Sequence, residues 1–226
     1  MYQITIDGLS GSGKSSVARK LAERLGIMYF DDDLVIAGLA SVFLGKRINP
    51  TSEDKILDFL KDATVVLEGF GKDASVIING EDVSNKLNNK VVQTCAYTLS
   101  KQTVIEKYLR ILQLKAAQRQ NLVVEGYNTG TTLFPRARYK FFLKADSEVR
   151  AQRKYEELTE MGVTDFKYED ILRDTEEKDN LYFSGEMAKI DVSEDTHFID
   201  TSNNTSNDTV DQMLEIIKGV GWCITF

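Results

Sequence analysis

Apolar and polar residues alternate at the start of the chain, and apolar residues then recur at helical spacing. Residues 2–7, YQITID, alternate and include β-branched side chains, which predicts a strand. A glycine-rich turn follows. Beyond it, a helix is predicted by apolar residues at helical spacing, namely Val17, Ala18, Leu21, Ala22 and Leu25. Gly26 is the expected stop of this helix.

Strand-like and helix-like segments continue to alternate along most of the chain. Further strands are predicted at residues 27–30, 121–125, 139–144 and 196–200. Helices are predicted at residues 34–44, 51–62, 90–119 (in two segments), 147–162, 167–180 and 208–221. Thr51 or Ser52, followed by acidic residues, indicates a capping box, while Ser147 and Gly162 are expected to begin and end one helix. Strands that alternate with helices predict the α/β class, with a mainly parallel sheet between helices.

The pattern changes between about residues 64 and 80. Two β-type runs lie there, separated by Gly and Asp residues, and Asn79-Gly80 forms a further turn signal. We therefore expect a hairpin, as an antiparallel piece inserted into the parallel fold.

The composition limits the classes of partner. The 226 residues are 42% hydrophobic and 28% charged, the balance of a globular protein, and the length suits one α/β domain with an insertion. The net charge of −7 disfavours nucleic acid as a partner. No apolar run approaches the ~20 residues that a membrane helix needs, and the first residues lack a secretion signal. No pattern indicates an oligomeric state.

Residues that bind zinc or form disulfides are few. Cys95 and Cys223 are the only cysteines, so no disulfide framework is expected, which fits a reducing cytoplasm. His197 is the only histidine, and we interpret it as a strand residue near the sheet edge.

The glycine-rich turn carries the strongest chemical signal. Residues 8–15, GLSGSGKS, fit the pattern G-x-x-x-x-G-K-[ST] between a strand and a helix. Glycines let successive N–H groups point at a phosphate, and the following helix adds its positive end. Lys14 is expected to reach the β- and γ-phosphates, and the Ser15 hydroxyl to coordinate Mg²⁺. The residues expected to bind ATP are Gly8, Ser10, Gly11, Ser12, Gly13, Lys14, Ser15 and Ser16.

This loop alone does not separate kinases from GTPases and ATPases. A GTPase should carry N-K-x-D, and the nearest stretch, NKLNNK at residues 85–90, lacks the aspartate. The chain also lacks the additional elements of motor-type ATPases. A small-molecule kinase is the best remaining class.

Several blocks together resemble bacterial cytidylate kinases. They are residues 4–26, INGEDVS at 78–84, EGYNTGTTLFPRARYKFFLKADSEVRAQRK at 125–154 and FIDTS at 198–202. The resemblance implies one P-loop kinase domain over residues 1–226, with a five-stranded mainly parallel sheet. Its core would be formed by residues 1–32, 120–165 and 190–226, its acceptor-binding insertion by 33–119 and its helical lid by 166–189.

The donor side matches this family. Glu125 falls where the family has an acidic residue that helps to order the Mg²⁺ shell, so we expect it to face Lys14 and Ser15. Arg153 matches an arginine of the helix that leads to the lid, where a guanidinium would neutralise charge on the transferring group. For Arg150 we favour a solvated helix face.

The acceptor side departs from the family. The Arg-Asp pair of the family is Tyr127-Asn128 here, the Tyr-Arg pair after the second strand is Ile36-Ala37, and an arginine of the acceptor region falls at Glu106. The lid retains only Lys178 and Asp179 of its pattern. Asn128 would hydrogen-bond a base edge or sugar, and Tyr127 would stack on a ring.

The run Asp31-Asp32-Asp33 allows a second interpretation. FDDD resembles the end of strand two in shikimate- and gluconate-type kinases, where a carboxylate orients the acceptor hydroxyl. Asp33 would take that catalytic role with Asp31 nearer the metal, or the run simply caps the helix that follows.

Three functions therefore stay open. The first is ATP- and Mg²⁺-dependent phosphorylation of a nucleoside monophosphate of CMP or dCMP type. The second is phosphorylation of another acceptor, either a different nucleotide or a hydroxylated metabolite. The third is nucleotide binding without catalysis, as a regulator.

Overall fold

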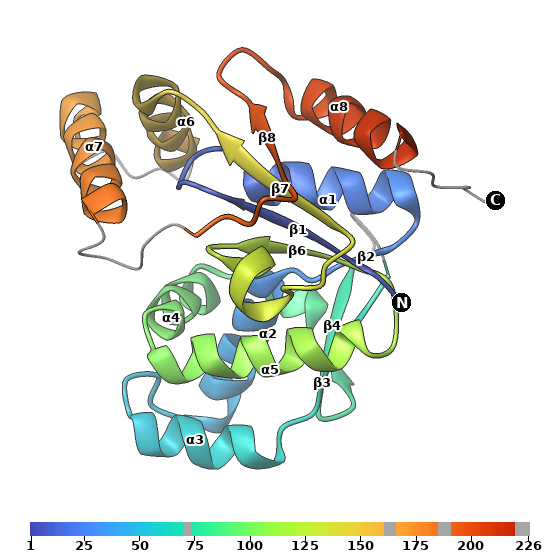
Figure 1. Ribbon diagram of the computed structural model, residues 1–226. Helices are drawn as coiled ribbons and strands as arrows, with labels where there is room; N and C mark the ends of the chain where they lie inside the picture. Colours follow the sequence, from blue (N-terminus) through green and yellow to red (C-terminus); the bar gives the residue numbers. More distant parts are fainter. Residues whose placement is uncertain (70–73, 161–165, 185–190, 220–226) are drawn as a thin grey trace. The chain divides into compact units, whose positions relative to one another are not determined.

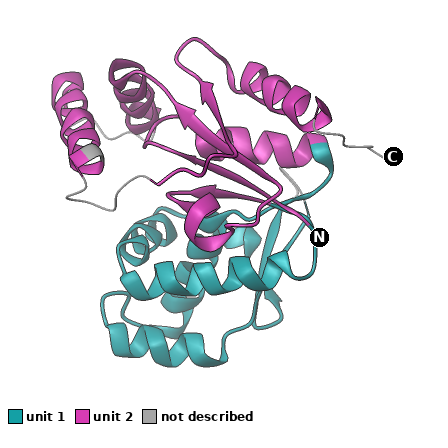
Figure 2. Ribbon diagram, viewed as in Figure 1, with its two compact units in different colours: residues 1, 25–122 teal, residues 2–24, 123–226 magenta. Residues whose placement is uncertain are grey.

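The chain folds into two compact units. The computed structural model describes residues 1–69, 74–160, 166–184 and 191–219. Unit 1 consists of Met1 and Leu25–Leu122, and unit 2 of Tyr2–Arg24 and Val123–Phe226 (Figure 2). Unit 2 combines the N-terminal segment with the C-terminal half because the first strand pairs with a strand more than a hundred residues further along the chain.

The main sheet has five strands in the order β2-β6-β1-β7-β8 (Figure 1). The strands are β1 (Gln3–Gly8), β2 (Met28–Tyr29), β6 (Leu122–Gly126), β7 (Tyr139–Lys144) and β8 (Thr196–Asp200). β7 runs parallel to both β1 and β8, and its Phe141 pairs with Ile6 on one side and His197 on the other. The expected parallel sheet is confirmed, and so is the place of His197 on an edge strand.

Burial explains why β1 and β7 occupy the interior of this sheet. Ile4 and Ile6 of β1 and Phe141 and Leu143 of β7 are completely buried. Strands that are covered on both faces read as continuous apolar runs, as the YKFFLK segment nearly does. The carboxyl ends of these parallel strands meet at one edge, where ligands bind in open α/β sheets.

Four helices of unit 2 pack around its strands. They are α1 (Lys14–Leu25), α6 (Ser147–Glu160), α7 (Tyr168–Ser184) and α8 (Ser206–Gly219). α1 and α8 lie side by side, joined by a hydrogen bond of 2.6 Å from Lys20 Nζ to Ser206 Oγ (Figure 1). α7 packs on α6, where the Tyr168 and Tyr155 rings meet edge to face at 6.3 Å. The expected end of α6 at Gly162 lies outside the described residues.

Unit 1 contains a helical group and a small sheet. Its elements are α2 (Asp32–Lys46), α3 (Glu53–Asp62), β3 (Val65–Glu68), β4 (Ser75–Ile78), β5 (Glu81–Asp82), η2 (Ser84–Lys86), α4 (Lys90–Ser100) and α5 (Thr103–Ala117). β3 and β4 pair antiparallel, so the predicted hairpin is confirmed. Asn79 and Gly80 have positive φ of 52° and 81°, as a tight turn between twisted strands requires.

The predicted capping box at α3 is wrong. Ser52 is the N-cap residue of α3, but its side chain makes no capping hydrogen bond. Thr51 instead donates its hydroxyl to Asn49 Oδ1 at 2.9 Å, which satisfies that hydroxyl within the preceding turn. The helix therefore begins at the expected place without the reciprocal side-chain bonds.

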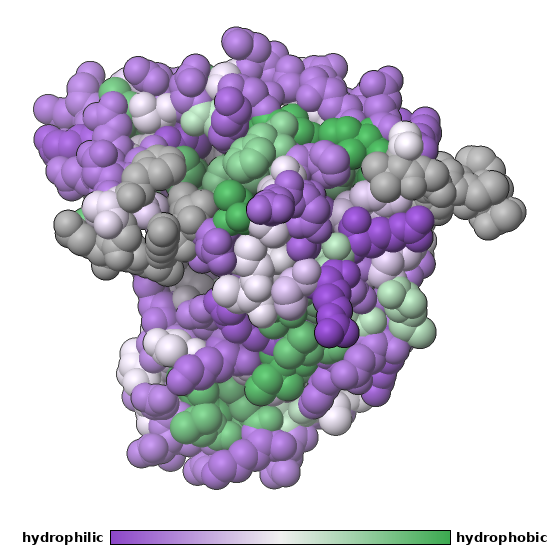
Figure 3. Space-filling model, in the orientation of Figure 1, coloured by the Kyte–Doolittle hydropathy of each residue, from purple (hydrophilic) through white to green (hydrophobic). Residues whose placement is uncertain are grey.

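Apolar surface gathers over α3 and α5 of unit 1 on the face drawn in Figure 3. The exposed large apolar residues of these two helices include Leu57 of α3 and Ile111 and Leu114 of α5. Within the described ranges, no helix is both long and apolar enough to cross a membrane.

Candidate active site

The loop from Gly8 to Ser15 joins β1 to α1, and its shape requires glycine at two positions. Gly8 has a φ of 150°, and a Cβ added there would lie 2.3 Å from the carbonyl oxygen of Leu143 on β7. Gly11 has a φ of 77°, and its added Cβ would lie 2.9 Å from Cβ of Arg150 on α6. The loop thus passes so close to its neighbours that no larger side chain fits.

Lys14 is buried at the start of α1. Its Nζ donates a hydrogen bond of 3.0 Å to the carbonyl oxygen of Leu9, so the ammonium lies back inside the loop. Burial lowers the pKa of Lys14, while the carboxylates of Glu125 and Asp7 oppose this shift. A cation held at the centre of the loop is suited to phosphate oxygens.

Ser15 and Glu125 meet as expected. The Ser15 hydroxyl donates a hydrogen bond of 2.7 Å to Glu125 Oε1, although 110 residues separate them in the chain. A hydroxyl and a carboxylate are hard oxygen ligands, which Mg²⁺ prefers. In the described ranges, no group of three or more His, Cys, Asp or Glu side chains gathers to hold a metal. The pair fits Mg²⁺, which usually takes few protein ligands and fills its shell with water and phosphate oxygens.

Asp7 anchors the segment that follows β6. Its two carboxylate oxygens accept hydrogen bonds from the backbone N–H groups of Thr129 and Gly130, at 2.7 and 2.8 Å. These residues belong to η3 (Thr129–Leu133), a short π-helical turn that the sequence pattern does not predict. The anchor fixes the chain just beyond Tyr127 and Asn128.

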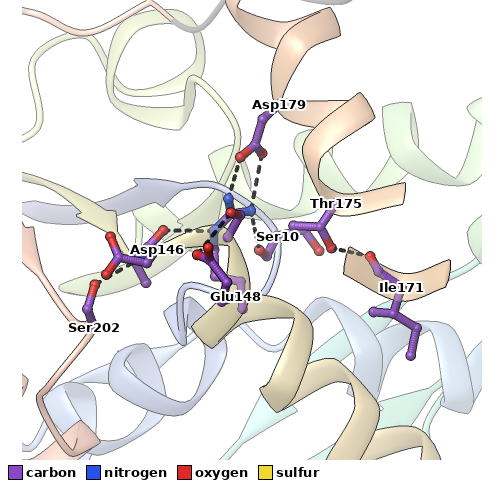
Figure 4. A network of polar contacts seen from close by, with 10 residues as sticks. Ser10, Asp146, Glu148, Ile171, Thr175, Asp179 and Ser202 are labelled. Carbon is purple, nitrogen blue, oxygen red and sulfur yellow. Dashed lines mark hydrogen bonds and ion pairs between the residues drawn. The ribbon is translucent and has the colours of Figure 1, made fainter. Parts of the chain in front are cut away.

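Arg150 packs against the loop, and its expected place on a solvated face is wrong. Its side chain is 2% exposed. Its guanidinium donates to the carbonyl oxygens of Ala145 at 2.9 Å and Ser10 at 3.3 Å. It also forms a bidentate ion pair with Asp179 of α7, whose carboxylate points toward the guanidinium nitrogens in Figure 4. The loop and α7 bury this side chain through contacts with residues distant in the sequence.

Arg153 lies at the same loop from the next turn of α6. It donates to the carbonyl oxygen of Gly11 at 3.3 Å and to that of Thr201 at 2.6 Å. The Thr201 hydroxyl in turn donates to the carbonyl oxygen of Ser12 at 3.0 Å. Thr201 belongs to the FIDTS block, which the sequence marks without revealing this contact.

The remaining serines of the loop differ in exposure. Ser10 and Ser16 are exposed, whereas Ser12 is completely buried. Among the described residues, the Ser12 hydroxyl has no hydrogen-bond partner.

Tyr127 and Asn128 follow the strand end differently. The Tyr127 ring lies near Lys14, with Nζ 4.9 Å from its centroid, and stacks on Tyr182 of α7 at 5.4 Å with the planes 13° apart. Desolvation and the neighbouring Tyr182 raise the pKa of Tyr127 to about 12. Asn128 has a φ of 54°, and its Oδ1 accepts a hydrogen bond of 2.9 Å from the backbone of Asp191. The sequence pattern does not predict the contact of Tyr127 with Tyr182 or that of Asn128 with Asp191.

The acidic run Asp31-Asp32-Asp33 belongs to unit 1. Asp31 is the N-cap of α2, and its Oδ1 accepts from the backbone of Leu34 at 3.1 Å. Asp32 accepts from Gln113 Nε2 at 2.9 Å. Asp33 is exposed on the first helical turn. Asp31 therefore makes the helix-capping contact that was the alternative to a role in the active site.

Comparisons with known proteins identify the family of the chain. A sequence model of the family described as cytidylate kinase matches residues 4–219. The cytidylate kinase of Caldanaerobacter subterraneus subsp. tengcongensis is 32% identical over 216 residues, covering 96% of this chain and 94% of that protein. The cytidylate kinase of Thermodesulfovibrio yellowstonii is 33% identical over 217 residues, covering 94% and 96%.

The solved structures support the fold. An uncharacterized protein from Eubacterium ventriosum has a TM-score of 0.53 at 14% identity, covering 96% of this chain and 99% of that chain. The family match extends over nearly the whole chain. The chain therefore belongs to the cytidylate kinase family, a family of phosphotransferases.

Proposed function

We propose that the protein transfers the γ-phosphoryl group of ATP, with Mg²⁺, to a nucleoside monophosphate of CMP or dCMP type. The observation that carries the donor half is the 2.7 Å bond between Ser15 and Glu125 beside the buried Lys14. Membership of the cytidylate kinase family supports the acceptor half.

Each donor residue has a role that its chemistry suits. The loop N–H groups and the positive end of α1 would bind the phosphates of ATP. Lys14 would exchange its bond to Leu9 for the β- and γ-phosphate oxygens. Arg153, held at the loop by Gly11 and Thr201, would neutralise charge on the transferring group.

Ser15 and Glu125 would hold Mg²⁺, the serine directly and the carboxylate by ordering the ion's shell. When bound, the ion neutralises charge on the phosphate oxygens that accompany transfer. Tyr127 and Asn128 would contact the acceptor, the tyrosine by stacking and the asparagine through its amide.

A coupled assay tests this function directly. ADP release is measured with ATP, CMP or dCMP and Mg²⁺, and ATP binding is measured separately. Lys14→Ala should remove turnover, whereas Lys20→Ala on the same helix, where Lys20 bonds to Ser206 of α8, should not. Bound ATP without any CMP- or dCMP-dependent ADP release would refute the proposal, and would leave a kinase with another acceptor or a regulator that binds nucleotide without catalysis.

A second candidate is phosphorylation of a different acceptor, such as another nucleotide or a hydroxylated metabolite. It is favoured by the uncharged Tyr127 and Asn128 and by the exposed carboxylate of Asp33. A panel of nucleosides, nucleoside monophosphates and small hydroxy acids separates the candidates. Here Asp33→Asn should abolish turnover without changing ATP affinity, while Asp54→Asn, in the first turn of α3, should leave turnover intact. Unchanged turnover of Asp33→Asn would count against this candidate.

A further inference from the structure

Helix α7 places two side chains against groups that surround the phosphate loop. The Asp179 carboxylate pairs with Arg150, which is 2% exposed and donates to the Ser10 carbonyl oxygen (Figure 4). The Tyr182 ring stacks on Tyr127 with a centroid separation of 5.4 Å. Asp179 and Tyr182 are three residues apart, so they lie on one face of the helix.

Together these two side chains carry the chemistry of a nucleotide. A carboxylate is an anion that binds a guanidinium through two parallel hydrogen bonds, as a phosphate does. A phenol is a planar ring that stacks on another ring, as a nucleobase does. The near-parallel planes, 13° apart, show that Tyr127 offers a flat face.

We propose that α7 is an internal substitute for the acceptor, with Asp179 in place of its phosphate and Tyr182 in place of its base. The true acceptor is then a compound with both a planar ring and a phosphate, and it displaces these side chains when it binds. This rests on the proposed function, because it takes the acceptor to be a nucleoside monophosphate rather than a sugar or hydroxy acid.

The burial of Arg150 explains why an anion must replace Asp179. A guanidinium that is removed from water is costly unless it is paired. Its bonds to Ala145 and Ser10 hold it in place, so it stays available when α7 leaves. The Asp179 side chain is 17% exposed, so this partner of the buried Arg150 can be reached from solvent.

The exposure of Tyr127 supports the same exchange. This residue is 40% exposed in spite of the stacked Tyr182 ring, so a ligand can reach it. A sugar phosphate or an aliphatic hydroxy acid supplies no face to replace the phenol, whereas a nucleobase does.

Three probes separate the two contacts, and their affinities are measured by calorimetry in the full chain. CMP carries ring and phosphate, cytidine only the ring, and ribose 5-phosphate only the phosphate. Tyr182→Ala should tighten the binding of CMP and cytidine about 3- to 10-fold and leave ribose 5-phosphate unchanged. Asp179→Asn should tighten CMP and ribose 5-phosphate by a similar factor and leave cytidine unchanged.

Matched variants on α7 control for general loosening of the helix. Asp174→Asn removes an exposed carboxylate that pairs with Lys178, and Leu181→Ala truncates the exposed neighbour of Tyr182. Neither should change the affinity for any probe. The proposal would be overturned if Tyr182→Ala and Asp179→Asn raised the affinity for all three probes equally. It would also be overturned if neither variant raised the affinity for any probe.

A further measurement, of ATP affinity, shows whether Arg150 binds the phosphate of the acceptor or a phosphate of ATP. The design also separates this proposal from the proposed function. If Asp179→Asn tightens ATP but neither CMP nor ribose 5-phosphate, Arg150 serves the donor and the proposal fails. Because binding is measured without turnover, the crossed pattern would support the inference even where CMP is not phosphorylated. If Asp179→Asn does not fold, as a melting curve will show, Tyr182→Ala alone decides: unchanged affinity for cytidine refutes the proposal.

Discussion

The carboxylate of Glu125 accepts a hydrogen bond from the Ser15 hydroxyl, and in the proposed function it also orders the shell of a metal ion. The 2.7 Å bond between Ser15 and Glu125 holds both oxygen ligands on the same side of the loop. Glu125→Gln keeps the shape but removes the charge, so kcat should fall about 10- to 100-fold and the Mg²⁺ requirement should rise.

The check is a Mg²⁺ titration of turnover at saturating ATP. Glu157→Gln, an exposed glutamate of α6 that pairs with Lys154, serves as the control and should behave as the wild type. A Mg²⁺ requirement that does not change in Glu125→Gln would remove this residue from the metal site.

The side chain of Asp7 makes the free energy of unfolding depend on pH. Burial raises its pKa above the ordinary value, although the backbone N–H groups of Gly130 and Thr129 and the charge of Lys14 oppose the shift. A raised folded-state pKa contributes stability that is full below the unfolded pKa of about 4 and is lost as pH rises through the folded value. Asp7→Asn cannot titrate, so the stability advantage of the wild type should narrow as pH rises above about 4.

Urea unfolding of both proteins at several pH values measures this difference. The variant should be less stable by about 1–3 kcal/mol at low pH, since the Asn side chain turns an NH2 group toward one of the two backbone N–H groups, whereas both oxygens of the protonated carboxyl still face them. An advantage that widens with rising pH would show that the Asp7 pKa is lowered instead.

The junction of β1 and β7 controls stability at the scale of elements. Gly8 pairs in register with Leu143, whose carbonyl oxygen would lie 2.3 Å from an added Cβ. Gly8→Ala must therefore push two buried strands apart, and it should cost more than about 3 kcal/mol of the free energy of unfolding. Gly26→Ala is the control, because φ there is +61° but no atom lies within 4 Å, so only about 1 kcal/mol of backbone strain is expected.

Denaturant unfolding of the two variants gives this comparison. Equal losses would mean that strain at positive φ, and not the contact with β7, requires glycine at the loop. The same logic connects the loop to the elements around it, since Gly11 meets α6 as Gly8 meets β7.

Ligand binding should be visible at the scale of the whole molecule. A ligand that binds only the folded state stabilises it by about 2.7 kcal/mol at a concentration of 100 times Kd. A non-hydrolysable ATP analogue with Mg²⁺ should therefore raise the melting temperature of the wild type. Lys14→Ala should show little shift at the same concentration, and Lys20→Ala the full shift. An equal shift in all three proteins would place ATP away from the loop.

Local patterns in the sequence are sufficient to predict the helices and strands and the glycine-rich loop. Local spacing of apolar residues, turn residues such as Asn79-Gly80, and the glycine pattern of residues 8–15 each act over a few neighbouring positions. The strands, the hairpin and the two helices between 90 and 119 accordingly form where the pattern predicts them. The capping box failed because Thr51 bonds to the preceding turn.

Only the tertiary structure shows which polar groups are buried and which aromatic rings stack. Arg150 lies 140 residues from Ser10 in the chain and 29 from Asp179, and no local periodicity reports such contacts. The stack of Tyr127 on Tyr182 is of the same kind. Burial and long-range pairing depend on how strands and helices pack. The sequence therefore predicts the glycine-rich loop, but it does not predict which side chains lie around that loop.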